Sequence, residues 1–229
     1  MVRENHLYKD INMTQKTNCA GSCSCKEKTH KFSRIVLTGG PGAGKTAILE
    51  MAQKYFCEHV FILPEAASII FGGGFWRNNT ISAKKAAQRA IYHVQKEIET
   101  MVEEEYKIAI ALCDRGTIDG LAYWPSEESL FWEDLMTTKK KEFSKYSAVI
   151  HLRTPTLKEG YNHSNPVRIE TAKEARIIDE RIVNVWDGHP KRFFVESTDD
   201  FFEKVSKTIE LIYNELPECC KGHLAKKLL

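Results

Sequence analysis

A glycine-rich segment at residues 39–46 has the residue types and the spacing that bind nucleotide phosphates. It reads Gly-Gly-Pro-Gly-Ala-Gly-Lys-Thr and matches the pattern G-x-x-x-x-G-K-[ST] in full. Glycines let backbone N–H groups converge on phosphate oxygens, a lysine can reach the β- and γ-phosphates, and a threonine hydroxyl can ligate Mg²⁺. We therefore predict that a nucleoside triphosphate binds through Gly39, Gly40, Gly42, Ala43, Gly44, Lys45 and Thr46.

The residues around this segment are those that a phosphate loop requires. The run before it, at residues 34–38, is short and apolar like a buried parallel strand, and the run after it, at 47–56, has a helical apolar stripe. Helical segments separate four further strand candidates, at residues 59–63, 108–113, 148–152 and 192–195. The longest helical candidate could begin at a Ser82 cap, and an apolar stripe runs along it from Ala83 to Met101. This alternation predicts an α/β fold of the P-loop NTPase type, a five-stranded parallel sheet with helices on both faces.

Polar side chains at the ends of two predicted strands are candidates for chemistry. Asp114 could hold the water shell of Mg²⁺ or accept a proton, and Arg115 could clamp a phosphate, although the two could also form a local ion pair. Glu65 could orient or deprotonate an acceptor hydroxyl, or simply place a charge at the start of the next helix. Because ligands of such folds bind at the carboxyl ends of the strands, we expect these side chains near the phosphate loop.

Three arginines on or beside a predicted late helix could add positive charge to the same site. A mobile lid that brings arginine to the γ-phosphate would use this region. On a helical wheel Arg168 and Arg176 lie about 80° apart, whereas Arg181 points elsewhere, so at most two could share one ligand. Ordinary surface pairs with nearby carboxylates are the alternative, and Asp179 is one of these carboxylates.

The bulk properties of the chain exclude several classes of partner. Its 229 residues carry a net charge of +2, which gives no electrostatic reason to expect nucleic acid. No apolar run approaches the roughly 18–20 residues of a membrane span, and the polar N-terminus lacks a secretory signal, so we expect a cytoplasmic protein. We divide the chain into a disordered cysteine-containing extension, a P-loop domain and a basic C-terminal tail, at residues 1–31, 32–217 and 218–229.

The seven cysteines do not indicate a disulfide scaffold in a chain of this length. Three of them match no common zinc pattern and are interpreted as exposed thiols of the N-terminal extension: Cys19, Cys23 and Cys25. Cys57 and Cys113 lie in apolar runs and are interpreted as small buried side chains. Cys219 and Cys220 lie beside lysines, where a frayed basic end is favoured over lipidation.

Five segments of the chain together resemble a known family. They read GGPGAGKT, LPEAAS, CDRGTIDGLAYWP, NPVRIETAKEARIIDERI and WDGHPKRFFVEST. The set resembles the ATP-binding AAA-domain family of P-loop NTPases, related to nicotinamide-ribonucleotide-kinase-like and nucleoside-kinase-like proteins, over about residues 32–216. The resemblance implies a kinase-like P-loop fold and a Mg²⁺ and substrate role for Asp114 and Arg115. It also implies a lid at about residues 157–190 that carries Arg168 and Arg176.

Motifs and resemblance together predict a Mg²⁺-dependent, ATP-binding small-molecule kinase with a nucleoside- or nucleotide-like acceptor. The predicted catalytic residues are Lys45, Glu65, Asp114, Arg115 and Arg176. Arg168 is predicted to bind the nucleotide, and Thr46 and Asp114 to bind the metal. The alternative is a nucleotide-dependent switch or binding module, using ATP or GTP, that acts through a protein or lipid partner.

Overall fold

The computed structural model describes residues 30–155, 171–198 and 200–221. Five strands and eight α-helices, with one 3₁₀ helix, make up this part of the chain. In chain order they are β1 (Ser33–Thr38), α1 (Lys45–Tyr55), β2 (Val60–Leu63), α2 (Ala66–Gly72), α3 (Ile81–Glu105), β3 (Ile110–Asp114), the 3₁₀ helix η2 (Asp119–Tyr123), α4 (Glu128–Asp134), α5 (Lys139–Phe143), β4 (Ala148–Leu152), α6 (Ala172–Val185), β5 (Arg192–Val195), α7 (Phe201–Glu215) and α8 (Glu218–Lys221).

The five strands form one parallel sheet in the order β2-β3-β1-β4-β5, which confirms the predicted fold class. The central strand, β1, pairs with β3 on one side and β4 on the other. The chain leaves β1 toward β2 on one side and later returns to build β4 and β5 on the other side. The loop after β1 therefore lies where the order of strands reverses, which is where open α/β sheets bind ligands.

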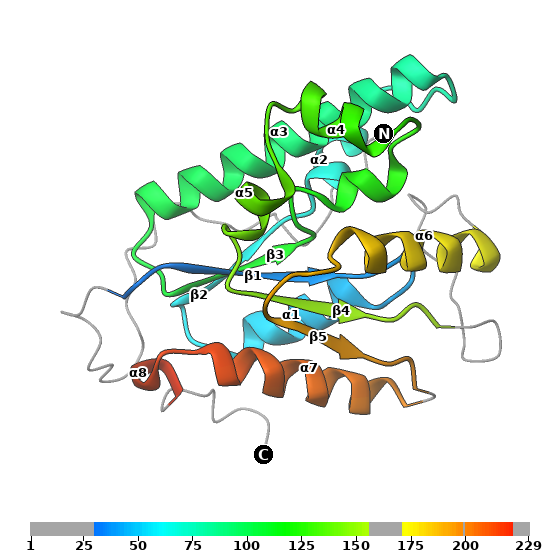
Figure 1. Ribbon diagram of the computed structural model, residues 1–229. Helices are drawn as coiled ribbons and strands as arrows, with labels where there is room; N and C mark the ends of the chain where they lie inside the picture. Colours follow the sequence, from blue (N-terminus) through cyan, green and yellow to red (C-terminus); the bar gives the residue numbers. More distant parts are fainter. Residues whose placement is uncertain (1–29, 156–170, 199, 222–229) are drawn as a thin grey trace.

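Helices cover both faces of the sheet, as Figure 1 shows. Along β1, Ile35 and Leu37 face a core shared with α1 and α7, whereas Val36 faces a second core shared with α3 and α6. The strict alternation follows from the two-residue period of a strand, and every β1 residue from Ile35 to Thr38 is buried because both faces are covered. The buried sheet therefore holds the loops of the site at the carboxyl ends of its strands.

The long helix α3 differs in detail from the expected amphipathic helix. The Thr80 hydroxyl, rather than that of Ser82, caps it by accepting a hydrogen bond from the Ala83 backbone N–H. Its buried face contains three polar side chains beside the apolar ones: Gln88, Gln95 and Glu99. A simple apolar stripe was therefore an incomplete prediction, because this face of α3 covers a polar cavity and a hydrogen-bond network.

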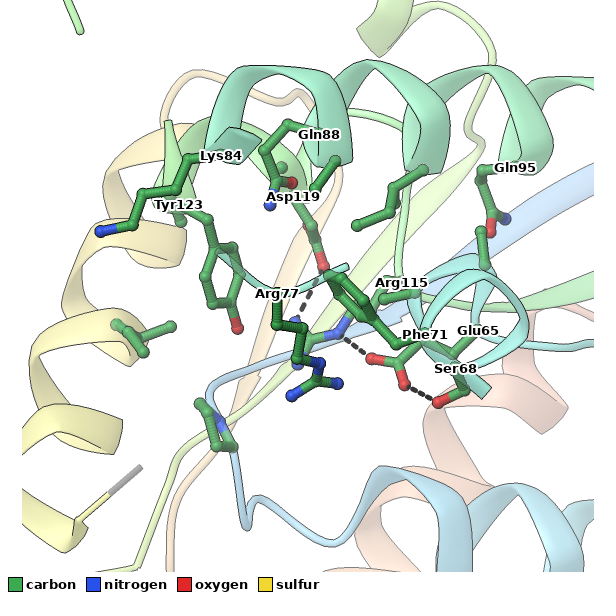
Figure 2. A pocket seen from close by; sticks show the side chains of 18 of the residues that line it. Glu65, Ser68, Phe71, Arg77, Lys84, Gln88, Gln95, Arg115, Asp119 and Tyr123 are labelled. Carbon is green, nitrogen blue, oxygen red and sulfur yellow. Dashed lines mark hydrogen bonds and ion pairs between the residues drawn. The ribbon is translucent and has the colours of Figure 1, made fainter. Parts of the chain in front are cut away.

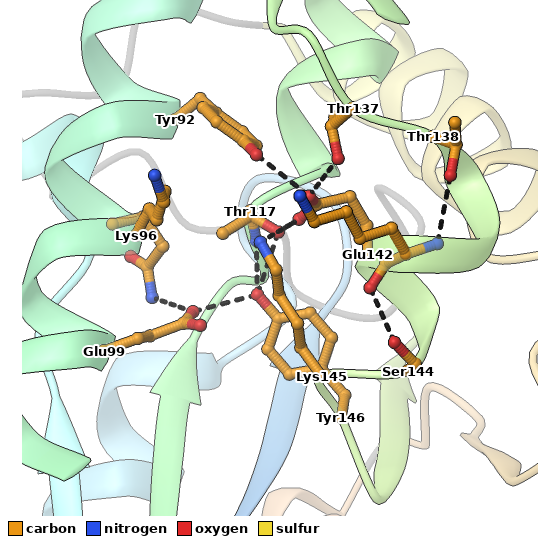
Figure 3. Close-up of polar contacts among 12 residues, drawn as sticks. Tyr92, Lys96, Glu99, Thr117, Thr137, Thr138, Glu142, Ser144, Lys145 and Tyr146 are labelled. Carbon is orange, nitrogen blue, oxygen red and sulfur yellow. Dashed lines mark hydrogen bonds and ion pairs between the residues drawn. The ribbon is translucent and has the colours of Figure 1, made fainter.

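That network ties α3 to α5 and to the loop after β3 (Figure 3). Glu142 on α5 is fully buried and accepts hydrogen bonds from Tyr92, Thr117 and Thr137 at 2.9, 2.6 and 2.6 Å. The ammonium group of Lys145 lies 2.6 Å from the same carboxylate. Because Thr117 follows the Asp114-Arg115 pair by only two residues, these bonds fix the loop that presents the pair.

Replacing Glu142 with alanine is expected to destabilise the fold by about 3 kcal/mol, because several buried donors lose their acceptor. Burial alone would raise the pKa of Glu142, but hydrogen bonds from Lys145 and Thr117 hold it below its usual range. The carboxylate therefore stabilises the protein above its unfolded pKa of about 4.3 and loses this effect as the pH falls through the lower folded value. Urea unfolding at a series of pH values from 7 down to 3 measures both effects.

The exposed Glu133→Ala provides the matched control and should change the free energy of unfolding by less than about 0.5 kcal/mol. A Glu142→Ala protein as stable as the wild type at pH 7 would show that the network contributes nothing to folding.

Candidate functional site

The phosphate loop has the backbone conformation that its glycines permit. Gly39 and Gly44 have φ angles of 137° and 89°, in the left-handed region. A Cβ atom on Gly39 would lie 2.1 Å from the Leu152 carbonyl oxygen, so only glycine fits between β1 and β4. Gly44 is the N-cap of α1, so the loop ends with free backbone N–H groups at a helix N-terminus. This arrangement binds anions.

Lys45 lies folded against its own loop. Its ammonium group donates hydrogen bonds to the carbonyl oxygens of Gly39 and Gly40 at 3.0 and 3.2 Å. The pKa of Lys45 is lowered to about 8, mainly because the side chain is buried and to a smaller extent because Arg115 is positively charged. The side chain is thus poised between two weak acceptors, and phosphate oxygens would be stronger partners.

Asp114, the last residue of β3, is buried next to Lys45. The pKa of Asp114 is raised to about 7, mainly because the side chain is buried and to a smaller extent because Glu65 is negatively charged. Its Oδ1 atom is buried without a hydrogen-bond partner among the residues that the structure describes. A buried carboxylate oxygen with no partner is unusual in native proteins, and a bound ion or water is one of its ordinary explanations.

Arg115 connects the strand end to Glu65. It has a φ angle of 75°, which is rare for a residue other than glycine and is typical of strained positions in functional sites. Its Nε atom donates to Glu65 Oε1 at 2.6 Å and its Nη1 atom to the Gly39 carbonyl oxygen at 3.2 Å. The guanidinium therefore links the start of α2, the end of β3 and the phosphate loop. Arg115 thus forms a local ion pair and also lies in the candidate site.

Glu65 is the N-cap residue of α2 and remains a quarter exposed. Burial opposes its ionisation, but the charges of Arg115 and Lys45 hold the pKa of Glu65 below its usual value. The Ser68 hydroxyl donates a hydrogen bond to its second oxygen. The predicted proximity of Glu65 to Asp114, Arg115 and Lys45 is therefore found in the structure.

Asp119 is a site residue that the sequence analysis did not single out. It is buried next to Arg115 and accepts hydrogen bonds at 2.5 Å from Thr38 Oγ1 and from the indole N–H of Trp186. Its Oδ2 atom lies 3.6 Å from Arg115 Nη1. Asp119 thus holds Arg115 in place and links β1 to the end of α6.

A cavity of about 440 Å³ opens beside the phosphate loop. Figure 2 shows Glu65, Arg77, Arg115 and Tyr123 directed into it from different elements. Trp76 and Tyr123 line it, whereas Trp124 packs in a separate apolar cluster with Phe131. Five basic side chains and three acidic ones line the cavity: Lys45, Arg77, Lys84, Arg115 and Arg181, with Glu65, Asp114 and Asp119. The charge of the lining therefore favours an anionic ligand.

Helix α6 is tied to the phosphate loop through Asp179. The backbone N–H of Gly40 donates to Asp179 Oδ1 at 2.8 Å, and His151 Nε2 lies 2.9 Å from the same oxygen. Arg153 pairs with the other carboxylate oxygen at 3.0 Å. The sequence had suggested a surface ion pair for Asp179, but the residue is only 3 % exposed. It occupies one N–H of the loop that would otherwise be available to phosphate.

The three late arginines fall in different places. Arg168 lies outside the described residues, so its nucleotide contact stays a prediction. Arg176 is exposed on α6 and is not among the residues that line the cavity, and its catalytic role also stays a prediction. Arg181, which the helical wheel had directed elsewhere, lines the cavity. The described half of the predicted lid region therefore supplies one arginine to the site.

The order of strands, the loop after β1 and the polar strand ends define a P-loop NTPase. Comparison with protein families gives a match to the AAA domain over residues 34–204, about three quarters of the chain, so the protein belongs to this AAA-domain family. Among curated proteins the comparison finds no match. Membership of this family and the phosphate loop indicate a nucleotide-binding protein. No helix in the described residues has the length and apolarity to cross a bilayer.

Proposed function

We propose that this protein is a Mg²⁺-dependent kinase that transfers the γ-phosphoryl group of ATP or GTP to a small, anionic, nucleotide-like acceptor. The observation that carries the proposal is the cavity that continues from the phosphate loop past Glu65 to Arg77 and Lys84. A hydrolase needs room for one water beside the γ-phosphate, whereas about 440 Å³ is in the range of small-molecule sites.

The residues present fit a nucleotide-bound magnesium ion. Thr46 is exposed at the start of α1 and lines the cavity, and so does Asp114, whose buried Oδ1 atom has no hydrogen-bond partner among the described residues. Oxygen ligands of these two types are those that Mg²⁺ takes in nucleotide sites. The bound ion would neutralise charge on the β- and γ-phosphates, with Thr46 and Asp114 holding it or its water shell.

The other residues would position the reactants and stabilise charge. Lys45 would exchange its two carbonyl partners for phosphate oxygens, and Arg115 would lie beside the transferring group. Glu65, ionised at neutral pH, would accept a hydrogen bond from the acceptor hydroxyl and orient it for in-line attack. Phosphoryl transfer depends mainly on such positioning and electrostatics, so these residues include the types of group that the reaction needs.

The acceptor side of the cavity favours a ligand with an aromatic ring and a negative charge. Trp76 and Tyr123 offer aromatic rings to the cavity, while Arg77 and Lys84 add positive charge to the same lining. A nucleoside monophosphate has both features. The aromatic and basic side chains of the lining therefore favour a nucleotide-like acceptor over a neutral sugar or alcohol.

Replacing Asp114 with asparagine is expected to remove the Mg²⁺-dependent part of nucleotide binding and to lower phosphoryl transfer by about 10²–10³-fold. The change is isosteric and neutral in a buried position, so the fold should persist. Nucleotide titrations with Mg²⁺ and with EDTA separate the metal effect from the phosphate loop. Asp187→Asn, on an exposed turn, is the control. An Asp114→Asn protein that retained the full Mg²⁺ effect would remove Asp114 from the metal site.

A nucleotide-dependent switch is the second candidate, and one contact favours it. Asp179 on α6 holds the Gly40 N–H of the phosphate loop, so a phosphate that claims this N–H would displace the carboxylate and shift α6. The output would then be a change in the position of α6, read by a protein or lipid partner, and turnover would be slow.

Thermal unfolding with ligands distinguishes the two candidates. The protein is heated with Mg²⁺ and each of ATP, GTP, ADP and GDP, alone and then with a panel of nucleosides, nucleoside monophosphates and phosphoinositide headgroups. A ligand at 100 times its Kd stabilises by about 2.7 kcal/mol. A further shift from a nucleotide-like compound on top of the nucleotide supports the kinase and identifies the acceptor class. Nucleotide shifts that no acceptor increases support the switch.

A further inference from the structure

A cluster of cysteine and histidine side chains lies at the edge of the sheet opposite the phosphate loop. His30 precedes β1, Cys57 and His59 lie between α1 and β2, and Cys219 and Cys220 belong to α8. Figure 1 shows that α8 and the beginning of β1 lie at the same end of the molecule, away from the loop that joins β1 to α1. Three segments distant in sequence therefore meet here.

The donor atoms in this cluster are close enough to share one metal ion. The ligand atoms of His30, His59 and Cys220 all lie within 4.8 Å of one another. Cys57 Sγ lies 3.7 Å from His59 Nδ1, and Cys220 is near enough to be the largest cause that lowers the pKa of the Cys57 thiol. Two ligands of a tetrahedral zinc ion are about 3.3–3.8 Å apart, since the bonds measure about 2.0–2.3 Å. The three atoms of His30, His59 and Cys220 would move closer by side-chain rotation, and Cys57, which is outside this group of three, would turn toward it from beside His59.

We propose that His30, Cys57, His59 and Cys220 form a Cys₂His₂ site for a structural zinc ion. Two thiolate and two imidazole ligands are a set that zinc takes in closed structural sites, and with four protein ligands no position remains open for substrate. Cys219 Sγ, 3.6 Å from His30 Nδ1, lies beside this set and completes its sulfur-rich surroundings.

The backbone around the cluster is already fixed by the fold. The carbonyl oxygen of His59 accepts hydrogen bonds from Ala109 N and Ile110 N at 2.9 and 3.0 Å, which locks the residue to the start of β3. Cys220 is 1 % exposed and His59 is 7 % exposed. Ligands held on a rigid backbone lose little conformational freedom when a metal binds, so the site is favourable for a structural ion.

A metal here would join the chain before β1 and helix α8 to the α1–β2 connection. Helix α8 has only four residues, and its contribution to the apolar core is Cys220 with its neighbour Cys219. A short helix gains little stability of its own, so a covalent-strength link to the sheet would hold it in place. A zinc ion here would stabilise this end of the sheet and would take no part in the proposed kinase activity.

Cobalt titration of the reduced, chelator-treated full-length protein tests the site. The background for every measurement is a variant in which the three N-terminal cysteines are replaced by serine, Cys19→Ser, Cys23→Ser and Cys25→Ser, so that they cannot contribute ligands. We expect this background variant to bind one Co²⁺ per chain with the d–d absorption of tetrahedral geometry and a thiolate charge-transfer band. Zn²⁺ should displace the cobalt and raise the midpoint of thermal unfolding.

Single substitutions in the background variant then assign the ligands. His59→Ala and Cys220→Ser should each weaken zinc binding by at least about 100-fold, the upper end of the loss that even outer-shell changes cause. Cys113→Ala, in the core of β3, is the matched control and should leave affinity unchanged. If the background variant shows no tetrahedral thiolate spectrum, or if it carries a Cys57–Cys220 disulfide under reducing conditions, the proposal is wrong. Unchanged zinc affinity in the His59 and Cys220 variants would also overturn it.

Discussion

Replacing Lys45 with alanine is expected to abolish nucleotide-dependent stabilisation and to lower phosphoryl transfer by at least about 10²–10³-fold. The ammonium group has only two carbonyl partners in the loop, at 3.0 and 3.2 Å, and is positioned to exchange them for phosphate oxygens. With a pKa of about 8 it is mostly protonated at pH 7, and bound phosphate would raise that pKa further. Calorimetric titration with ATP and GTP measures the loss of affinity.

Lys54→Ala is the matched control, because Lys54 lies exposed in the last turn of the same helix. It should leave both nucleotide affinity and stability unchanged. The Lys45→Ala protein itself should fold, since alanine is the best helix former at the start of α1 and the loop conformation rests on the glycines. A folded Lys45→Ala protein that binds nucleotide like the wild type would exclude the phosphate loop as the nucleotide site.

Replacing Glu65 with glutamine is expected to lower phosphoryl transfer by about 10²–10⁴-fold while leaving nucleotide affinity intact. Glutamine keeps the shape and one acceptor oxygen for the 2.6 Å contact with Arg115 Nε, but it loses the negative charge that would hold the acceptor hydroxyl. Measuring ADP formation in parallel with ATP affinity separates the two effects.

Two further variants sharpen the test of Glu65. Ser68→Ala keeps the carboxylate and removes only the hydrogen bond from the Ser68 hydroxyl, so its effect on transfer should be much smaller. Glu50→Gln, on the exposed side of α1, should have no effect. If Glu65→Gln retained full transfer activity, Glu65 would serve only as the N-cap residue of α2 and as a partner of Arg115. The nucleotide-dependent switch would then be the better hypothesis for the function.

The fold was predictable from sequence because its signals are local. The strand before the phosphate loop is a short apolar run, and the other strands stand out in the same way, so each predicted strand agrees with the structure to within two residues. The rule that ligands bind at the carboxyl ends of parallel strands then placed Glu65, Asp114 and Arg115 around the loop. The structure brings these three side chains and Lys45 together.

Contacts between residues far apart in the chain were not predictable in the same way. Asp179 lies 139 positions from Gly40, and its neighbours on α6 include other charged residues, so the sequence suggested a surface pair. Asp119 and Trp186 are likewise separated by 67 positions. The cysteine and histidine cluster was missed for the same reason, because Cys57 and Cys220 belong to segments that meet only in the folded sheet.

Helix α3 shows a different limit of sequence patterns. Its alanine and valine positions predicted an apolar stripe, and Ala87 is indeed buried, but Met101 at the end of the stripe is 37 % exposed. Gln95 and Glu99 are buried instead and bond to each other at 3.0 Å, and Tyr146 donates to Glu99 at 2.9 Å. Polar residues are buried here because partners on other elements satisfy them, which the local pattern does not contain.

Transfer of the γ-phosphoryl group is the most direct test of the proposed kinase. The purified protein is incubated with Mg²⁺ and γ-labelled ATP or GTP, together with a panel of nucleosides and nucleoside monophosphates, and the label is followed into the acceptor. We expect acceptor-dependent formation of nucleoside diphosphate and of a labelled product, which is lost in Lys45→Ala and strongly reduced in Glu65→Gln. Tight nucleotide binding that requires Lys45, without transfer of label to any acceptor in the panel, would contradict the kinase and leave the nucleotide-dependent switch.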